Sequence, residues 1–396
     1  MQHFKPIEYM KIDIANSFGL DKEIWTERIK WVDKNHDNLM DLIDDADEPA
    51  EYYAKVLSLY EVEAGKPTNS CCGLDATSSG TQLLSCITRD HKAASLCNVI
   101  CRTENGLVIR SDTYKIINNA LGGYYPKAQT KKAVMTSFYG SRAKPKELFG
   151  ENVNEFYAVM EKEAPLCWAL NEYILDYCWN TKAEVYEWTM PDNFHVAIEN
   201  YKVVEEEVIF NNESLTIEKK VVGATEEGRA LGANLTHSLD SHALREVIYM
   251  ASLSNKQRTK IQNLMKGNYE LNIGSSTNKT IVETLLKRYE ETNFMSARIL
   301  HYIDEGNFHL IPHEPLEEMM SFLPKRPFEV IGIHDNFKCH PNYVEDVRKM
   351  YTYYLAKLNR STFLDHWFKC IGMNDYDFKI GESFYDEILE TEYALS

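Results

Sequence analysis

The chain has 396 residues, of which 44% are hydrophobic and 26% charged, a composition typical of globular proteins with a sizeable core. Its formal net charge of −17 argues against binding a polyanion over the whole surface, because phosphate contacts need Lys and Arg. A local basic groove, or a partner that carries the basic surface, remains compatible with this charge. We find no apolar run of about 18 residues that would predict a membrane span, and no apolar N-terminal segment of a secretion signal.

The nine cysteines are odd in number, and several lie in apolar segments. No CxxC pair occurs, so a zinc site is not expected. The pattern predicts reduced, mostly buried thiols in a cytoplasmic protein.

The first part of the chain predicts helices, then a short strand. Apolar residues in 20–65 follow helical spacing, and residues 65–70 break the pattern. The stretch "CCGLD" predicts a buried strand that ends at Asp75, followed by a helix capped by Ser and Thr. From Lys127, a helical pattern continues to about Gly140.

The middle of the chain predicts a helical stretch over 151–179, interrupted near Pro165, and then a β-hairpin over 203–222 with an Asn-Asn turn. Residues 252–320 are polar and mostly helical in pattern, with "NIGSSTN" as a linker.

The segment "FEVIGIHDNFKCHPNY" predicts a strand, a turn and a second strand, with Asp335 at the turn. Asn342 and Glu345 predict a capping box for the helix that follows.

Asp75 and Asp335 both follow apolar β-type segments, and neither has Lys or Arg beside it in sequence. Two carboxylates brought together would repel each other, and a divalent cation would resolve that conflict. Oxygen ligands on a rigid scaffold suit Mg²⁺, and two such ions can activate an attacking hydroxyl and stabilise a leaving pyrophosphate. Helix capping is the simpler alternative for each Asp.

Lys127, Lys131, Met135 and Tyr139 are spaced four apart and form one stripe on the predicted helix. Two ammonium groups one turn apart could hold a triphosphate, and Lys131 could donate a proton to the leaving pyrophosphate. Tyr139 could meet a sugar or base. A solvated helix face is the alternative, so the spacing alone leaves the nucleotide interpretation open.

Four segments, in order, resemble the motifs of the single-subunit DNA-directed RNA polymerases of the T-odd phage and mitochondrial family. They are "LDATSSGTQ" (motif A), "KAQTKKAVMTSFYG" (motif B), "ANLTHSLDSHALR" and "IHDNF" (motif C). The segments "ERIKWVDKNHDNLM" and "ILETEYALS" also resemble the family. The resemblance covers nearly the whole chain except residues 252–320.

The resemblance implies an α+β, mainly helical, right-hand polymerase fold. Residues 1–90 and 237–396 would form the palm with a small antiparallel sheet, and 252–320 would be a helical insertion. Residues 91–236 would form the fingers, with the motif B helix at 127–140 and a specificity-type hairpin at 201–223.

The resemblance also implies roles for individual residues. Asp75 and Asp335 would hold two Mg²⁺ ions, with the Ala76 carbonyl as a further ligand. Lys131 would bind phosphate and act as the general acid, and Lys127 would neutralise phosphate. The remaining substrate-binding roles would fall to Tyr139 at the ribose, His237 at the nascent pair or 2′-hydroxyl, Tyr114 and Met135 near the templating base, and His334 in support of Asp335.

The chain departs from the family pattern in several places. Lys127 stands where the family usually has Arg, and the spacer between Tyr114 and Lys127 is short. Motif A arrives at residue 75, which leaves no room for the family's N-terminal domain and thumb. We therefore expect the larger, catalytic subunit of a heterodimeric phage RNA polymerase II, whose smaller partner carries the thumb, in the cytoplasm of an infected bacterium.

The first strand of the hairpin carries Glu205, Glu206 and Glu207, which phosphate would repel. We expect it to recognise duplex promoter DNA poorly, so that initiation needs single-stranded DNA delivered by a binding protein. Template DNA, nascent RNA and NTPs would be the other partners, and no membrane is expected.

Two alternatives stay open: a non-catalytic polymerase-like scaffold, and a fragment of a related DNA polymerase. The intact Asp75, Lys131 and Asp335 disfavour the first, and the "HSLDSHALR" segment disfavours the second. Extension of an RNA–DNA scaffold with NTPs or dNTPs would discriminate among them.

Overall fold

The computed structural model describes residues 1–104, 106–211, 213–225, 230–267 and 275–396. This part of the chain is mainly helical with small antiparallel sheets, which confirms the expected α+β class. None of its helices is long and apolar enough to span a bilayer.

The strands form a three-stranded sheet in the order β1-β9-β8 and the pairs β2-β3, β4-β5 and β6-β7. Their bounds are β1 (Cys72–Asp75), β2 (Arg102–Glu104), β3 (Leu107–Ile109), β4 (Val185–Thr189), β5 (His195–Glu199), β6 (Tyr201–Phe210), β7 (Glu213–Val222), β8 (Ile331–Ile333) and β9 (Asn336–Cys339).

The α-helices are α1 (Pro6–Ala15), α2 (Trp25–Asn35), α3 (Pro49–Glu63), α4 (Ser79–Thr88), α5 (His91–Leu96), α6 (Thr113–Ala120), α7 (Lys127–Phe138), α8 (Ala143–Phe149), α9 (Val153–Glu163), α10 (Pro165–Tyr177), α11 (Ala230–Ala251), α12 (Asn255–Met265), α13 (Lys279–Thr292), α14 (His313–Ser321), α15 (Val344–Arg360), α16 (Phe363–Cys370) and α17 (Tyr385–Leu389). A π-helical turn, η1 (Asn16–Leu20), follows α1. The 3₁₀ segments are η2 (His36–Asp45), η3 (Gly150–Asn152), η4 (Ala297–His301), η5 (Phe308–Leu310) and η6 (Pro341–Tyr343).

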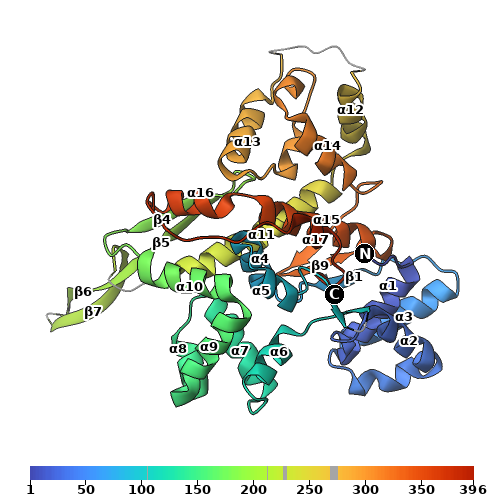
Figure 1. The fold of residues 1–396 in the computed structure, drawn as a ribbon, viewed down its shortest axis with the longest axis horizontal. Helices are drawn as coiled ribbons and strands as arrows, with labels where there is room; N and C mark the ends of the chain where they lie inside the picture. Colours follow the sequence, from blue (N-terminus) through green and yellow to red (C-terminus); the bar gives the residue numbers. More distant parts are fainter. Residues whose placement is uncertain (105, 212, 226–229, 268–274) are drawn as a thin grey trace.

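The three-stranded sheet lies near the centre of the molecule and contacts α1 and α15, and α15 in turn packs against α4 and α11 (Figure 1). All ten residues of α4 and 13 of the 17 residues of α15 are buried, so both helices belong to the core. Gly332 in β8 packs against α11, where a Cβ would lie 2.4 Å from the Leu244 side chain. A side chain at this position would require the Leu244 side chain to move.

Helices α1 to α3 pack around Trp25 and Tyr52, which are fully buried, and form one side of the molecule (Figure 1). The helices expected over 20–65 are therefore confirmed. The break at Pro165 is also confirmed, because α9 ends at Glu163 and α10 starts at Pro165.

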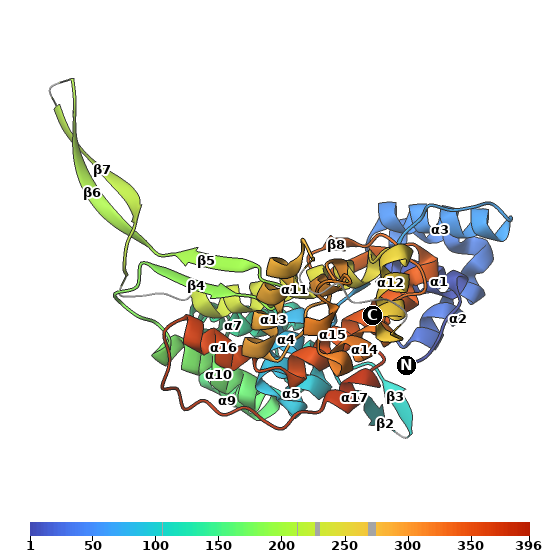
Figure 2. The same ribbon diagram turned by 90° about the horizontal axis from the view of Figure 1, so that it is seen from above.

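The predicted hairpin is confirmed, and β6 and β7 pair over their full length. It projects from the body as a long two-stranded arm (Figure 2), and nearly all of its residues are exposed. Asn211 lies at the turn with φ of 51°, while Asn212 of the expected Asn-Asn turn is outside the described residues.

The helical content expected for 252–320 is confirmed, since α12, α13 and α14 form a lobe beyond α11 and α15 (Figure 1). Three residues of the expected linker, 272–274, lie outside the described residues.

Two capping predictions were wrong. Ser78 precedes α4, but its hydroxyl contacts the Thr81 hydroxyl at 3.0 Å and does not cap the helix. The capping box of Asn342 and Glu345 is absent, because α15 starts at Val344 with Tyr343 as its N-cap. Glu345 instead accepts hydrogen bonds from side chains of α1 and α15, so tertiary partners outcompete the local cap.

The thiol prediction is confirmed. All nine cysteines are free, and those in the core are Cys72, Cys86, Cys97, Cys167, Cys178 and Cys339.

Candidate functional site

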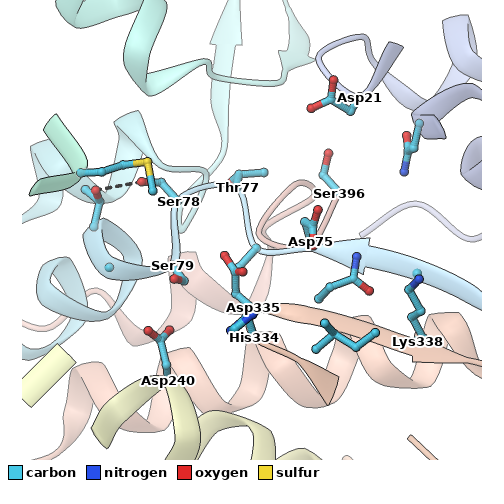
Figure 3. A pocket seen from close by; sticks show the side chains of 18 of the residues that line it. Asp21, Asp75, Thr77, Ser78, Ser79, Asp240, His334, Asp335, Lys338 and Ser396 are labelled. Atoms are coloured by element: carbon cyan, nitrogen blue, oxygen red, sulfur yellow. Dashed lines mark hydrogen bonds between the residues drawn. The ribbon is translucent and has the colours of Figure 1, made fainter. Parts of the chain in front are cut away.

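A cavity of about 990 Å³ opens beside the central sheet (Figure 3). Its lining combines residues that are far apart in sequence, from α1, β1, α4, α7, α11 and the β8–β9 turn. Of the site residues expected from sequence, those that line it are Asp75, Ala76, Tyr114, Lys131, Met135, Tyr139, His237, His334 and Asp335.

The pairing of β1 with β9 brings the two expected carboxylates together. Asp75 ends β1 directly opposite Asn336, the residue after Asp335. The Ala76 amide, just after β1, donates a hydrogen bond to the Asp335 carbonyl, just before β9, at 3.1 Å. Figure 3 shows the Asp75 and Asp335 side chains next to each other at the cavity wall.

Partial burial, followed by the negative charge of Asp335, raises the pKa of Asp75, although a hydrogen bond from Asn336 opposes the rise. The other charges that act on this carboxyl, from Glu48 and Asp21, are negative as well. The strongest charges that act on the Asp75 carboxyl are therefore all negative.

This donor set fits a hard divalent cation. Among the described residues, no group of three or more His, Cys, Asp or Glu side chains is arranged to hold a metal ion by itself. An ion on Asp75, Asp335 and the Ala76 carbonyl would need water or phosphate oxygens to complete its shell, as Mg²⁺ in proteins usually does.

The helix α7 presents the predicted stripe to the cavity, with one exception. Lys131 is exposed, and its Nζ lies 5.7 Å from the centroid of the Tyr114 ring. Met135 and Tyr139 follow on the same face. Lys127 does not line the cavity, and its Nζ pairs with Asp112 at 2.7 Å.

Tyr139 lies at the end of α7, where Gly140 has φ of 82° and stops the helix. Its ring stacks on His237 of α11 with centroids 5.1 Å apart and planes 15° apart. Burial raises the pKa of Tyr139 to about 12, so its hydroxyl keeps its proton at neutral pH. The stacked pair forms a flat wall on one side of the cavity.

His334 is the first residue of the two-residue turn between β8 and β9, with φ of 57°. This left-handed conformation favours Gly, and a bulky residue here costs about 1 kcal/mol or more. The strained residue thus directly precedes Asp335 in the turn. The exposed His334 ring lines the cavity.

Several cavity residues were missed from the sequence. Asp240 lies one turn after His237 on α11, and burial together with Asp335 raises its pKa to about 7. The spacing of three residues could have placed it on the same face. Arg110 also lines the cavity, and no local sequence pattern marks it. Ser79 lies within the stretch that drew attention to Asp75.

The cavity is lined by two adjacent carboxylates of the central sheet, an exposed lysine and a stacked Tyr–His pair. This arrangement suits a phosphorylated ligand and a divalent cation.

Comparison with known proteins agrees with this class. Residues 4–187, just under half of the chain, match the family model described as DNA-dependent RNA polymerase. A Neurospora crassa protein named "Probable DNA-directed RNA polymerase" is 34% identical over 106 residues, which cover 25% of this chain and 12% of the relative. The chain therefore spans well under two thirds of that relative.

The matched range contains Asp75, Lys131 and Tyr139, whereas Asp335 and His237 lie outside it. The pairing of β1 with β9 brings Asp335 next to the matched range, and the stacking on Tyr139 does the same for His237.

Proposed function

We propose that this chain is the catalytic part of a DNA-directed RNA polymerase of the phage and mitochondrial type. It transfers nucleotides from NTPs to the 3′ end of an RNA under the direction of a DNA template. The observation that carries the proposal is that Asp75, Lys131 and Asp335 line one cavity. Asp75 and Lys131 lie inside the range that matches the family model, and Asp335 lies outside it.

Two Mg²⁺ ions on Asp75, Asp335 and the Ala76 carbonyl would lower the pKa of the attacking hydroxyl and stabilise the leaving pyrophosphate. Lys131 neutralises phosphate charge and donates a proton to the leaving group. Its exposed ammonium group supports this role. Lys127, paired with Asp112, would act only at the outer edge of the phosphates.

The Tyr139–His237 wall holds the sugar, and the stacked geometry supports this placement. Tyr114 and Met135 shape the pocket beside the templating base, and His334 supports the turn that carries Asp335. All three side chains line the same cavity.

The architecture that fits this function is the right-hand polymerase fold. The sheet that bears both carboxylates would be the palm, from residues 1–90 and 237–396, and α7 would belong to fingers over 91–236. The three-stranded antiparallel sheet and the helical surroundings of α7 support this division.

A partner subunit that carries basic surface would complete the nucleic-acid groove. The excess of 60 Asp and Glu over 43 Lys and Arg supports this need, because an RNA–DNA hybrid requires cations. The phage origin, and with it the cytoplasm of an infected bacterium, rest on the sequence resemblance.

The hairpin β6–β7 would bind duplex promoter DNA weakly, so that a single-stranded-DNA-binding protein assists initiation. Glu205 faces Glu218 across the ladder, and this acidic pair supports the proposal. Reversing one of these charges should therefore raise the affinity for duplex DNA.

The direct test is single-nucleotide addition on a saturating RNA–DNA scaffold, because one addition needs the site but not processive binding. We expect the chain to add an NMP with Mg²⁺, and Asp75→Ala or Asp335→Ala to reduce the rate by about 10³-fold or more. Circular dichroism should show both variants folded. Wild-type rates in either variant, or no addition by the wild type at saturation, would refute the proposal.

A further inference from the structure

A run of cations lies in and around helix α12, on one side of the 252–320 lobe (Figure 1). The chain carries 60 Asp and Glu among its 396 residues, yet residues 252–267 contain none. The same stretch contains four cations, which are Lys256, Arg258, Lys260 and Lys266. The helix is therefore a local basic surface on a molecule whose net charge is −17.

The packing of α12 fixes which of its faces meets the solvent. Ile261 and Leu264 are buried. The Gln257 side-chain amide donates to the carbonyls of Leu300 and Ile303, at 2.8 Å each, so the helix cannot turn about its axis without breaking both bonds. The opposite face is exposed or half-buried and consists of Asn255, Lys256, Thr259, Lys260, Gln262, Asn263 and Lys266.

The side chains of this face share one chemical property. Each can donate a hydrogen bond, through an ammonium, an amide or a hydroxyl group, and none of the seven carries negative charge. Asn255, Thr259, Gln262 and Lys266 recur at intervals of three or four residues, so they form a row along the helix. Side chains of these types make most of the contacts that proteins form with the phosphate backbone of DNA.

The ammonium groups of the face are accessible from the solvent. A second cavity, of about 710 Å³, opens over the first half of α12. Glu305 is the carboxylate in its lining, and it pairs with Lys260 at 2.7 Å. Lys256 and Lys266 are exposed, so an approaching phosphate can reach both ammonium groups.

Helix α13, on the other side of the lobe (Figure 1), differs from α12 in its charges. Lys287 of α13 is exposed, but Glu283, Glu290 and Glu291 lie one turn away from it along the helix. A phosphate near Lys287 would meet carboxylates as well as an ammonium group. The acid-free face therefore belongs to α12 and is not a general property of the helices of the lobe.

We propose that the exposed face of α12 binds the phosphate backbone of duplex DNA without distinguishing its sequence, and that the 252–320 lobe thereby holds the template duplex. The inference rests on the proposed function and deepens it by assigning a surface of this chain to the DNA. A duplex fits better than a single strand, because none of the seven side chains is aromatic and could stack on an unpaired base.

The test is a variant that combines Lys256→Ala with Lys266→Ala, two changes at exposed positions that leave the core intact. We expect the Kd for a labelled duplex of about 20 base pairs to rise about tenfold or more at about 0.1 M salt, whatever its sequence. The slope of log affinity against log salt should become shallower by about 2, because each lost phosphate contact removes about 0.9. Fluorescence anisotropy over a salt series measures both quantities, and circular dichroism confirms the fold.

The matched control combines Lys279→Ala with Lys287→Ala, which makes the same change in net charge at two exposed positions of α13. Its duplex affinity should stay within about twofold of the wild type, because salt screens charges that do not contact the DNA. An equal loss in the control variant would overturn the proposal, since net charge alone would then explain the binding. A loss that is as large on a single strand of the same length would overturn the choice of a duplex.

DNA binding does not depend on catalysis, so this assay separates the inference from the proposed function. If the wild type adds no nucleotide to a saturating scaffold, the proposed function fails, while a selective loss of duplex affinity in the α12 variant would still support the DNA-binding face. If the wild type adds nucleotides but the folded α12 variant binds the duplex with unchanged affinity, only the inference about α12 is overturned. It is overturned as well if the wild type shows no duplex binding at low salt.

Discussion

Asp240 contributes to the pH dependence of the stability of the protein. Its pKa is raised to about 7, chiefly by burial, whereas an unfolded Asp titrates near its model value of 3.8. Between these values the folded state holds a proton that the unfolded state lacks. The contribution of Asp240 to stability is therefore fully present below about pH 4 and is lost as pH rises to about 7.

We predict that the wild type loses stability relative to Asp240→Asn by up to about 1.4 kcal/mol per pH unit between pH 4 and 7, with no further change above pH 7. Urea denaturation of both proteins at pH 5, 6, 7 and 8, in EDTA, measures this difference. A difference that stays constant across the series would contradict the raised pKa.

At the residue scale, the sequence predicted the carboxylates and the helix stripe but not the groups that support them. Asp75 and Asp335 each follow an apolar strand, a local signal. The presence of Asp240 and Ser79 in the cavity lining depends on how α11 and α4 pack, which no local pattern specifies. The failed capping box has the same cause, because Glu345 binds partners that only the tertiary fold brings near.

At the element scale, the hairpin β6–β7 carries a local conflict. Glu205 and Glu218 are directly opposite in the ladder, where like charges destabilise the pairing. Glu206 instead faces Ile217, and its carboxylate lies 3.6 Å from the Lys219 Nζ. Two neighbouring glutamates thus have opposite electrostatic surroundings.

We predict that Glu205→Lys stabilises the hairpin by about 0.2–1 kcal/mol and strengthens duplex DNA binding in a salt-dependent way. Amide hydrogen exchange of β6 and β7 measures the stability of the hairpin. Fluorescence anisotropy with a labelled DNA duplex measures the affinity for duplex DNA.

Glu206→Lys is the matched control, since it makes the same change in net charge but breaks the pairing with Lys219. It should strengthen duplex binding similarly and slightly destabilise the hairpin. Equal exchange rates in the two variants would contradict the claim that Glu205 and Glu218 repel each other across the strands. Unchanged affinity for duplex DNA would contradict the claim that the acidic hairpin repels phosphate.

The strands and helices themselves were predictable where periodicity was strong. The hairpin has two β-type segments on either side of an Asn-Asn pair, and α7 follows a stripe that ends near Gly140. The pairing of β1 with β9 was not predictable from either strand alone, because the partners lie more than 250 residues apart in sequence. Only the recognised motifs suggested that they meet.

At the scale of the whole molecule, one buried cluster joins the 252–320 lobe to the core. Glu246 of α11 accepts hydrogen bonds from the Ser296 hydroxyl and, at 3.0 Å, from the Ala297 amide. The Lys357 Nζ of α15 lies 3.3 Å from the same carboxylate and donates to the Met295 carbonyl at 2.8 Å. The lobe is thereby anchored to α11, the helix that carries His237 and Asp240.

Composition predicted a globular, acidic chain, and the spatial arrangement of its parts came from the structure. The cavity draws on segments from nearly the whole length of the chain. Such a site depends on long-range packing, which periodicity and spacing do not encode.

The central claim is that the cavity performs templated nucleotide transfer, and changing one template base tests it most directly. Four scaffolds that differ only in the templating base are each incubated with all four NTPs and Mg²⁺, and the added nucleotide is identified by mass. We predict that the wild type adds the complementary ribonucleotide on every scaffold and that Asp335→Ala adds none. Addition of the same nucleotide on all four scaffolds, or addition by Asp335→Ala at the wild-type rate, would contradict the account.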